Sequence, residues 1–229
     1  MRKLLCLCGL ILWMGGCASK PEIFITSLPP AGEARGASAS ITEASLQEAG
    51  ISKRGDRIVV ARVSIRNRTG KAVLFGPEHV YLADATGELF LPISAKWLRD
   101  YYNARIRGLS AKTDPKAIAP YTSDSDTVKV GDTEFRSPAL TPAQREELAE
   151  EMAELVEEVF VRPQRDAPGT FLEKVPETTL GVLLKEITLK PDRGFTGFVY
   201  FYHSGATQPQ HPLRLIIDLE GEISAFLFQ

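Results

Sequence analysis

The side chains with the greatest potential for chemistry are three histidines, His79, His203 and His211. No two of them are three or four residues apart, so no helix would present a pair of them to one metal ion. His203 and His211 flank the segment "SGATQPQ" and would approach each other if it closed a hairpin. Because the chain offers too few further ligands around them, we interpret the pair as surface histidines and predict no metal site.

Other patterns that support catalysis are missing from the sequence. No Gly-x-Ser-x-Gly elbow presents a nucleophile, and no glycine-rich loop follows a predicted strand to hold phosphate. Asp124, Asp126 and Asp132 supply oxygen donors, but they lack the spacing and the closing glutamate of an EF-hand. We interpret them as solvated turn residues, predict no cofactor, and expect a protein that is not an enzyme.

Aromatic residues offer a possible binding site of another kind. Two distant segments carry the rings that would line a cleft for a sugar or a lipid, namely Trp97, Tyr101, Tyr102, Tyr200 and Tyr202. The competing interpretation places these rings in the core, because large aromatic area usually serves packing. The sequence favours the core and leaves the cleft as the alternative.

The first residues of the chain have the layout of a secretory signal. Met1-Arg2-Lys3 gives a short positive start, and the segment from Leu4 to Met14 is almost wholly apolar. This run is too short to cross a bilayer as a helix, which needs about 20 residues. It is followed by the small residues Gly15 and Gly16 and then by Cys17. We therefore predict that residues 1–16 are a signal peptide.

The sequence Met14-Gly15-Gly16-Cys17 resembles the lipobox of bacterial lipoproteins, although Leu is usual where Met14 stands. The resemblance implies that Cys17 becomes the first residue and that its thiol and its amine carry acyl chains. Several chains together give stable membrane anchoring. Ala18 and Ser19 differ from the aspartate signal that retains such proteins at the inner membrane. In a Gram-negative cell the protein would then be anchored in the outer membrane and face the periplasm.

The composition fits an exported body without disulfides. The chain has 27 basic and 29 acidic residues, and loss of Arg2 and Lys3 leaves 25 against 29, a formal charge of −4. Such acidity argues against a nucleic-acid partner, which would need a basic surface. Loss of Cys6 and Cys8 leaves Cys17 as the one cysteine, so the fold must depend on its hydrophobic core.

We divide the rest of the chain into a tether, residues 17–40, and one folded domain, residues 41–229. Within the tether, Ile23-Phe24-Ile25 is an apolar exception that would add a short strand or dock on the body. Alternating apolar residues predict strands in "RIVVARVSIRN", in residues 71–93 and in three segments from Gly197 to the C-terminus. Residues 41–50 are ambiguous between strand and short helix, and we favour strand. A helical insertion spans about residues 94–178, and residues 108–140 within it read as a polar loop.

The best-defined helix is predicted over residues 141–161. Thr141, Pro142 and Gln144 form a capping box with proline at the first helical position, and Pro163 is expected to end the helix. Its apolar stripe needs a partner, as does the aromatic face of the strand that carries Phe198, Tyr200 and Tyr202. We predict that the helix covers this face. The alternative is an open face that binds a ligand.

Residues 57–93 and 187–228 resemble the immunoglobulin-like β-sandwich domains of bacterial lipoproteins. The resemblance implies a mainly β fold, an antiparallel sandwich that becomes α+β through its helical insertion, but no single activity. Two functions stay open. The first is a non-enzymatic envelope lipoprotein that binds or scaffolds another envelope protein through the 105–140 loop and the helical insertion. The second is ligand binding or hydrolysis in the aromatic cleft.

Overall fold

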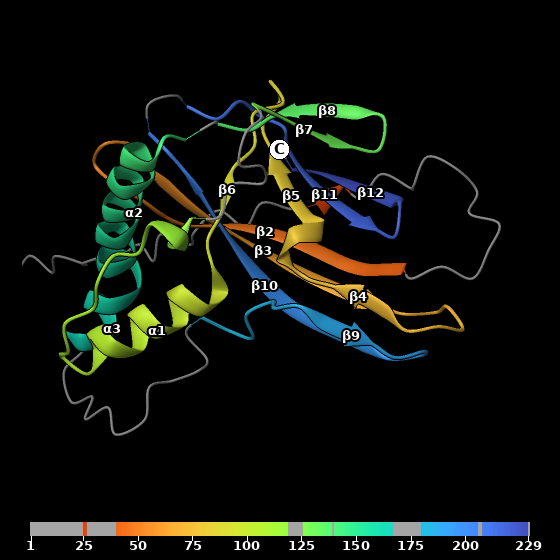
Figure 1. Ribbon diagram of the computed structural model, residues 1–229, viewed down its shortest axis with the longest axis horizontal. Coiled ribbons are helices and arrows are strands. Elements are labelled where there is room, and N and C mark those ends of the chain that lie inside the picture. The colour runs from red at the N-terminus through yellow and green to blue at the C-terminus, as the bar shows by residue number, and fades with distance from the viewer. Residues whose placement is uncertain are drawn as a thin grey trace, which may run out of the picture.

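The computed structural model describes residues 25–26, 40–118, 126–138, 140–166, 180–205 and 208–228. The fold is mainly β, with antiparallel sheets and helices gathered on one side (Figure 1). Among these residues no helix is long and apolar enough to span a bilayer. Two short 3-10 turns, η1 (Pro77–His79) and η2 (Pro115–Ala117), complete the helical elements.

Two antiparallel sheets form the centre of the molecule. The first has the order β2 (Ser40–Ile51), β3 (Arg57–Arg66), β10 (Gly194–His203), β6 (Leu91–Pro92). The second has the order β1 (Ile25–Thr26), β12 (Glu222–Phe228), β11 (Leu213–Leu219), β5 (Val80–Ala83). Two short ribbons pair β4 (Val73–Phe75) with β9 (Ile187–Leu189) and β7 (Thr127–Val130) with β8 (Thr133–Arg136).

The main core lies between the two sheets and follows the alternation of the sequence. Val199 and Phe201 point into it from β10, and Leu215 and Ile217 point into it from β11. Because side chains alternate across a strand, Tyr200 and Tyr202 lie on the opposite face of β10, as predicted. The strand expected at residues 41–50 is confirmed as β2.

The helices cover the outer face of the first sheet. Helix α1 (Ala95–Ile106) begins at the cap Ser94, and α2 (Pro142–Val156) lies beside it (Figure 1). Met152 and Val156 of α2 share a second core with Tyr200 and Tyr202. The prediction that this helix covers the aromatic face of β10 is therefore confirmed.

The capping box of α2 is present, but the predicted end of the helix is wrong. Thr141 accepts from the backbone of Gln144, whose side chain accepts in return from the backbone of Thr141. The chain does not stop at Pro163, because a π turn, η3 (Glu157–Val161), leads into a last turn, α3 (Arg162–Arg165). A widened turn shifts the preceding carbonyls, so the proline ring is accommodated instead of ending the helix.

The segment read as a polar loop contains a hairpin. Strands β7 and β8 bury Val128, Val130 and Phe135 against Ile216 on the outer face of the second sheet. The polar residues between them had suggested a loop, yet the apolar ones alternate as a strand requires. The described residues 126–136 are therefore a covering ribbon and not an open loop.

The predicted tether also contributes to the sheet. Ile25 and Thr26 pair as β1 with Phe228 and Leu227 of β12. The C-terminal strand is thus enclosed between β1 and β11, as expected for an apolar end that would otherwise be exposed.

Candidate functional site

The five aromatic residues that could line a cleft all lie in the second core. Tyr102 and Tyr202 are 1% and 0% exposed, and Trp97, Tyr101 and Tyr200 are also buried. Trp97 stacks on Tyr101 with 4.8 Å between ring centroids, and Tyr200 meets Phe160 edge to face at 5.7 Å. The structure therefore brings the five rings together as packing between α1, α2 and β10.

The polar atoms of these rings differ in whether they form hydrogen bonds. Tyr200 donates to the carbonyl of Leu180 at 2.9 Å, and burial raises the pKa of its hydroxyl far above the ordinary value. Trp97 Nε1 and Tyr102 Oη are buried and have no hydrogen-bond partner among the described residues. Tyr102 lines a cavity of about 510 Å³ between α1 and residues 180–185, with Lys96, Arg99 and Lys185 around it.

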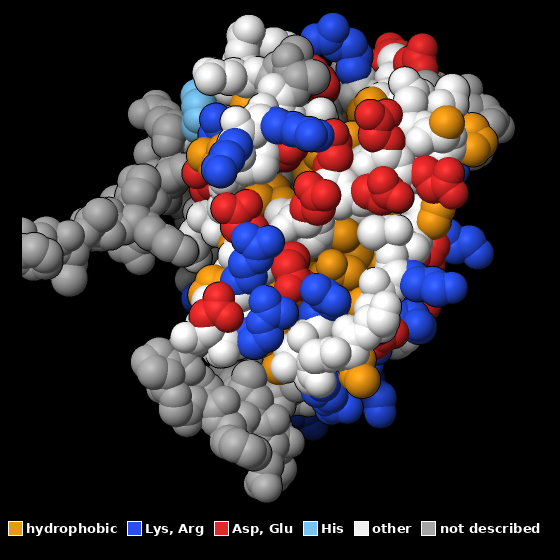
Figure 2. Space-filling view, turned by 90° about the vertical axis from the view of Figure 1, so that its left-hand side faces the viewer, with side chains coloured by type: hydrophobic (Ala, Val, Ile, Leu, Met, Phe, Trp, Pro, Cys, Tyr) orange, Lys and Arg blue, Asp and Glu red, His pale blue; other side chains and the backbone are white. Residues whose placement is uncertain are grey.

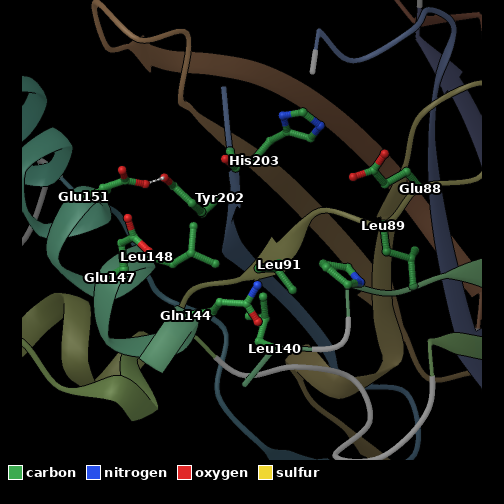
Figure 3. Close-up of a pocket in the computed structure, with 12 residues that line it drawn as sticks. Glu88, Leu89, Leu91, Leu140, Gln144, Glu147, Leu148, Glu151, Tyr202 and His203 are labelled. Carbon is green, nitrogen blue, oxygen red and sulfur yellow. Dashed lines mark hydrogen bonds between the residues drawn. The ribbon is translucent and has the colours of Figure 1, made fainter. Parts of the chain in front are cut away.

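A second pocket, of about 340 Å³, lies where α2 approaches the ends of β6 and β10. We call it the acidic pocket. Figure 3 shows Glu147, Leu148 and Glu151 projecting from α2 toward Tyr202 and Leu91, with Glu88 and Leu89 on the opposite side. Its lining residues are Glu88, Leu89, Leu91, Pro138, Leu140, Gln144, Glu147, Leu148, Glu151, Tyr202, His203 and Ser204.

The spacing of residues on α2 builds one wall of the acidic pocket. Gln144, Glu147, Leu148 and Glu151 recur at helical intervals, so they share one face of α2. The spacing of these four residues is visible in the sequence. Glu88 lies in the connection between β5 and β6. Its position opposite α2 results from the tertiary fold and cannot be read from the local sequence.

Glu151 is held in place by two contacts. Arg54 Nη1 lies 3.0 Å from Glu151 Oε1, and Tyr202 Oη donates to Glu151 Oε2 at 3.4 Å. Burial, with the charges of Asp56 and Glu151 nearby, raises the pKa of Tyr202 strongly, so this hydroxyl stays protonated and donates. Arg54 is largely exposed, and its pairing therefore neutralises Glu151 only weakly.

The loop beside the pocket is fixed by Asp56. One carboxylate oxygen accepts from Ser52 Oγ at 2.7 Å, and the other accepts from the backbone of Gly205 at 2.7 Å. Asp56 is buried, so these hydrogen bonds replace the water that the carboxylate loses. They connect the β2–β3 turn to the residues that follow β10, and this connection positions His203 and Ser204.

His203 was predicted to be a surface residue, and this prediction is wrong. Its side chain is 5% exposed and lies against the ring of Phe90 with 4.6 Å between centroids. Burial lowers the pKa of His203, although Glu88 and Asp84 act in the opposite direction, so the ring is neutral at pH 7. Its Nδ1 has no hydrogen-bond partner among the described residues. His211 is exposed and lines a different cavity.

The charge of the acidic pocket is one-sided. Glu88, Glu147 and Glu151 line it, and none of its described lining residues is a lysine or arginine. Figure 2 shows the helical side of the molecule, where acidic side chains gather over the upper half, at the height of α2, and basic ones over the lower half. No group of three metal-ligating side chains occurs in the described part of the chain. The described lining of the pocket therefore carries negative charge only.

One glutamate at the end of the acidic helix is buried, in contrast to the exposed glutamates of α2. Glu157 is buried, and its carboxylate binds Arg105 of α1 in two hydrogen bonds of 2.8 and 3.1 Å. Arg165 approaches the same carboxylate at 3.3 Å. The π turn places Glu157 toward α1, which helical spacing alone did not predict.

Other residues singled out in the sequence lie apart from both cavities. Asp126 and Asp132 are exposed at the β7–β8 ribbon, as expected of turn residues. Asp124 and the proposed lipidation site Cys17 lie outside the described residues.

Comparison with known proteins identifies no relative of this chain. No family model matches the chain. No curated protein and no solved structure matches it either.

Proposed function

We propose that the chain is a lipid-anchored cell-envelope protein that has no enzymatic activity and binds another envelope protein through its helical side. The anchor is Cys17, placed in the outer membrane and facing the periplasm if the cell is Gram-negative. The facing antiparallel sheets are compatible with an immunoglobulin-like sandwich, which we retain as part of the proposal.

The observation that carries the binding role is the acidic pocket on the helical side. It combines an apolar floor with three carboxylates, and α2 carries further exposed carboxylates such as Glu146 and Glu150. Charged residues arranged in this way speed and orient the docking of a partner of opposite charge. The exposed charge of α2 alone would not indicate a partner, and it is the pocket that supports one.

The anchor is tested by replacing Cys17 with serine. In cell fractions the Cys17→Ser protein should leave the membrane, whereas the unchanged chain stays with it, because the acyl chains are lost. Sedimentation of the variant with membranes would contradict the anchoring proposal.

The partner is tested by placing a photo-crosslinking amino acid at Glu150, on the helical side, in intact cells. A discrete protein adduct should form there. The same crosslinker at Lys190, which is exposed after β9 on the far side of the molecule, should not give this adduct. Identical adducts at both positions, or none at Glu150, would count against binding through the helical side.

The cavity that Tyr102 lines favours a second candidate function, the binding of a lipid or sugar. Its apolar residues Leu180 and Val182 and its basic rim would suit an anionic amphiphile. After loss of residues 1–16 the one tryptophan is Trp97, which lies on α1 close to this cavity. Laurate should change its fluorescence in the intact lipoprotein, and Lys96→Gln/Arg99→Gln should weaken that change. An unchanged spectrum would exclude this candidate.

A further inference from the structure

We propose that the acidic pocket receives a lysine or arginine side chain of the protein that docks on the helical side. The inference rests on the proposed function and names the chemistry by which the partner is recognised. Two independent features support it: the shape and apolar floor of the pocket, and its unbalanced charge.

The floor of the pocket suits an aliphatic stem. Leu89, Leu91, Leu140 and Leu148 line it together with Pro138. Lysine and arginine bury three or four methylene groups along apolar surface while their charged end reaches polar groups. The volume of about 340 Å³ is at the small end for ligand sites, and it suits one long side chain better than a larger cofactor.

The charge of the pocket selects a cation over a neutral apolar side chain. Glu88 and Glu147 form no ion pair with any described residue, while Glu151 is shared with the exposed Arg54. Glu147 is exposed and Glu88 and Glu151 are partly buried, so these carboxylates surround the pocket within reach of a charged group that enters it. A bound ammonium or guanidinium group would balance this charge and form charge-assisted hydrogen bonds.

His203 borders the pocket without adding charge to it. Because side chains alternate along β10, its ring lies on the face that carries Val199 and Phe201, where it packs against Phe90. Burial lowers the pKa of His203, so the ring is neutral at pH 7. The carboxylates on the α2 side of the pocket are therefore not balanced by this histidine.

The chemistry is tested with the intact lipoprotein in detergent, using saturation-transfer NMR of short peptides. The probe is Ac-Gly-Lys-Gly-NH₂, and the control peptide carries norleucine, which keeps the stem without the charge. The lysine peptide should bind saturably and the norleucine peptide should bind at least about tenfold more weakly. Equal binding of both would overturn the proposal.

Matched variants locate the binding. Glu88→Gln/Glu147→Gln removes two carboxylates from the pocket, and Glu146→Gln/Glu154→Gln removes two exposed carboxylates of α2 that do not line it. The first pair of substitutions should lower the affinity for the lysine peptide about tenfold or more, and the second pair should change it less than about twofold. Equal losses in both would show attraction by overall charge and overturn the pocket assignment. Thermal unfolding shows that both variants are folded.

The protein source of the cation is tested by repeating the Glu150 crosslinking in the same variants. The adduct should disappear with Glu88→Gln/Glu147→Gln and persist with Glu146→Gln/Glu154→Gln. If the adduct persists in both, the pocket inference fails and the proposed function stands. If the lysine peptide binds but no adduct ever forms, the proposed function fails, and the cation that the pocket binds does not belong to a partner protein. Competition with spermidine then tests a free amine.

Discussion

Glu157 shows how a single residue of a mostly solvated helix face can become part of the internal structure. Its carboxylate receives two hydrogen bonds from Arg105 and is nearly buried, while both arginines around it keep partial access to water. The hydrogen bonds and charge of Arg105 lower the pKa of Glu157, so the ion pair exists throughout the neutral range. The contact connects α1 to the π turn that follows α2.

The first prediction follows from this contact. Glu157→Gln should lower the free energy of unfolding by about 2 kcal/mol, because a charge-assisted hydrogen bond to Arg105 is lost while the side-chain shape is kept. The exposed Glu154→Gln is the matched control and should change stability by less than about 0.5 kcal/mol. Denaturant unfolding measures both. Equal stabilities of the two variants would mean that the pair is only a solvated contact.

His203 leads to a prediction on pH. Burial lowers its pKa in the folded state, although Glu88 and Asp84 oppose this and Arg57 acts with it. The unfolded chain therefore takes up the proton first as the pH falls below about 6.5, and the folded state loses stability there. His203→Gln should remove this loss between pH 7.5 and 5, whereas the exposed His211→Gln should retain it. Unfolding midpoints measured across that range decide the question.

At the scale of elements, some of the structure follows directly from local sequence. Helix α2 was predictable because a capping box, a proline and a regular apolar stripe all agree. Strand β10 was predictable because its residues alternate between two buried faces. The β7–β8 ribbon was missed, although Val128, Val130 and Phe135 alternate around the turn at Gly131, because the neighbouring polar residues dominated the interpretation.

The acidic pocket was only partly predictable. The stripe of Gln144, Glu147 and Glu151 on α2 is a local pattern, and helical spacing shows that these side chains share a face. Glu88 and His203 join them from segments more than fifty residues away, through sheet pairing that no local pattern specifies. The burial of His203 depends on Phe90 and on the loop fixed by Asp56, so no local sequence pattern indicates it.

The docking of the π turn on β2 gives a prediction at the element scale. A Cβ atom at Gly50, next to a register shift in β2, would overlap the side chain of Val159. Valine has little rotamer freedom in a helix, so it cannot move aside at low cost. Gly50→Ala should therefore cost about 1–3 kcal/mol of stability.

Two further variants test this explanation of Gly50. A Cβ at Gly70 would meet no atom, and Gly70→Ala should be close to neutral. Adding Val159→Ala to Gly50→Ala should recover part of the loss, which a double-mutant cycle would reveal as non-additivity. Additive losses would show that Gly50 is required for its backbone conformation and not for the approach of the π turn.

At the scale of the whole molecule, β1 determines how far the body can move from a membrane. If Cys17 carries the anchor, only eight residue steps separate it from Ile25, which is paired with Phe228 in the second sheet. A fully extended chain of this length spans at most about 29 Å. The expected tether of residues 17–40 is thereby reduced to the part before β1.

This geometry gives a final prediction that separates a short tether from a long one. A twenty-residue Gly/Ser spacer placed after Ser19 should let the body move away from the bilayer, because it precedes β1. The same spacer placed after Pro30 follows β1 and should leave the distance unchanged. Energy transfer from a dye on Ala225→Cys, which is exposed on β12, to a labelled lipid measures both. Because β1 lies between the two insertion points, an equal fall in transfer would show that β1 does not stay paired with β12.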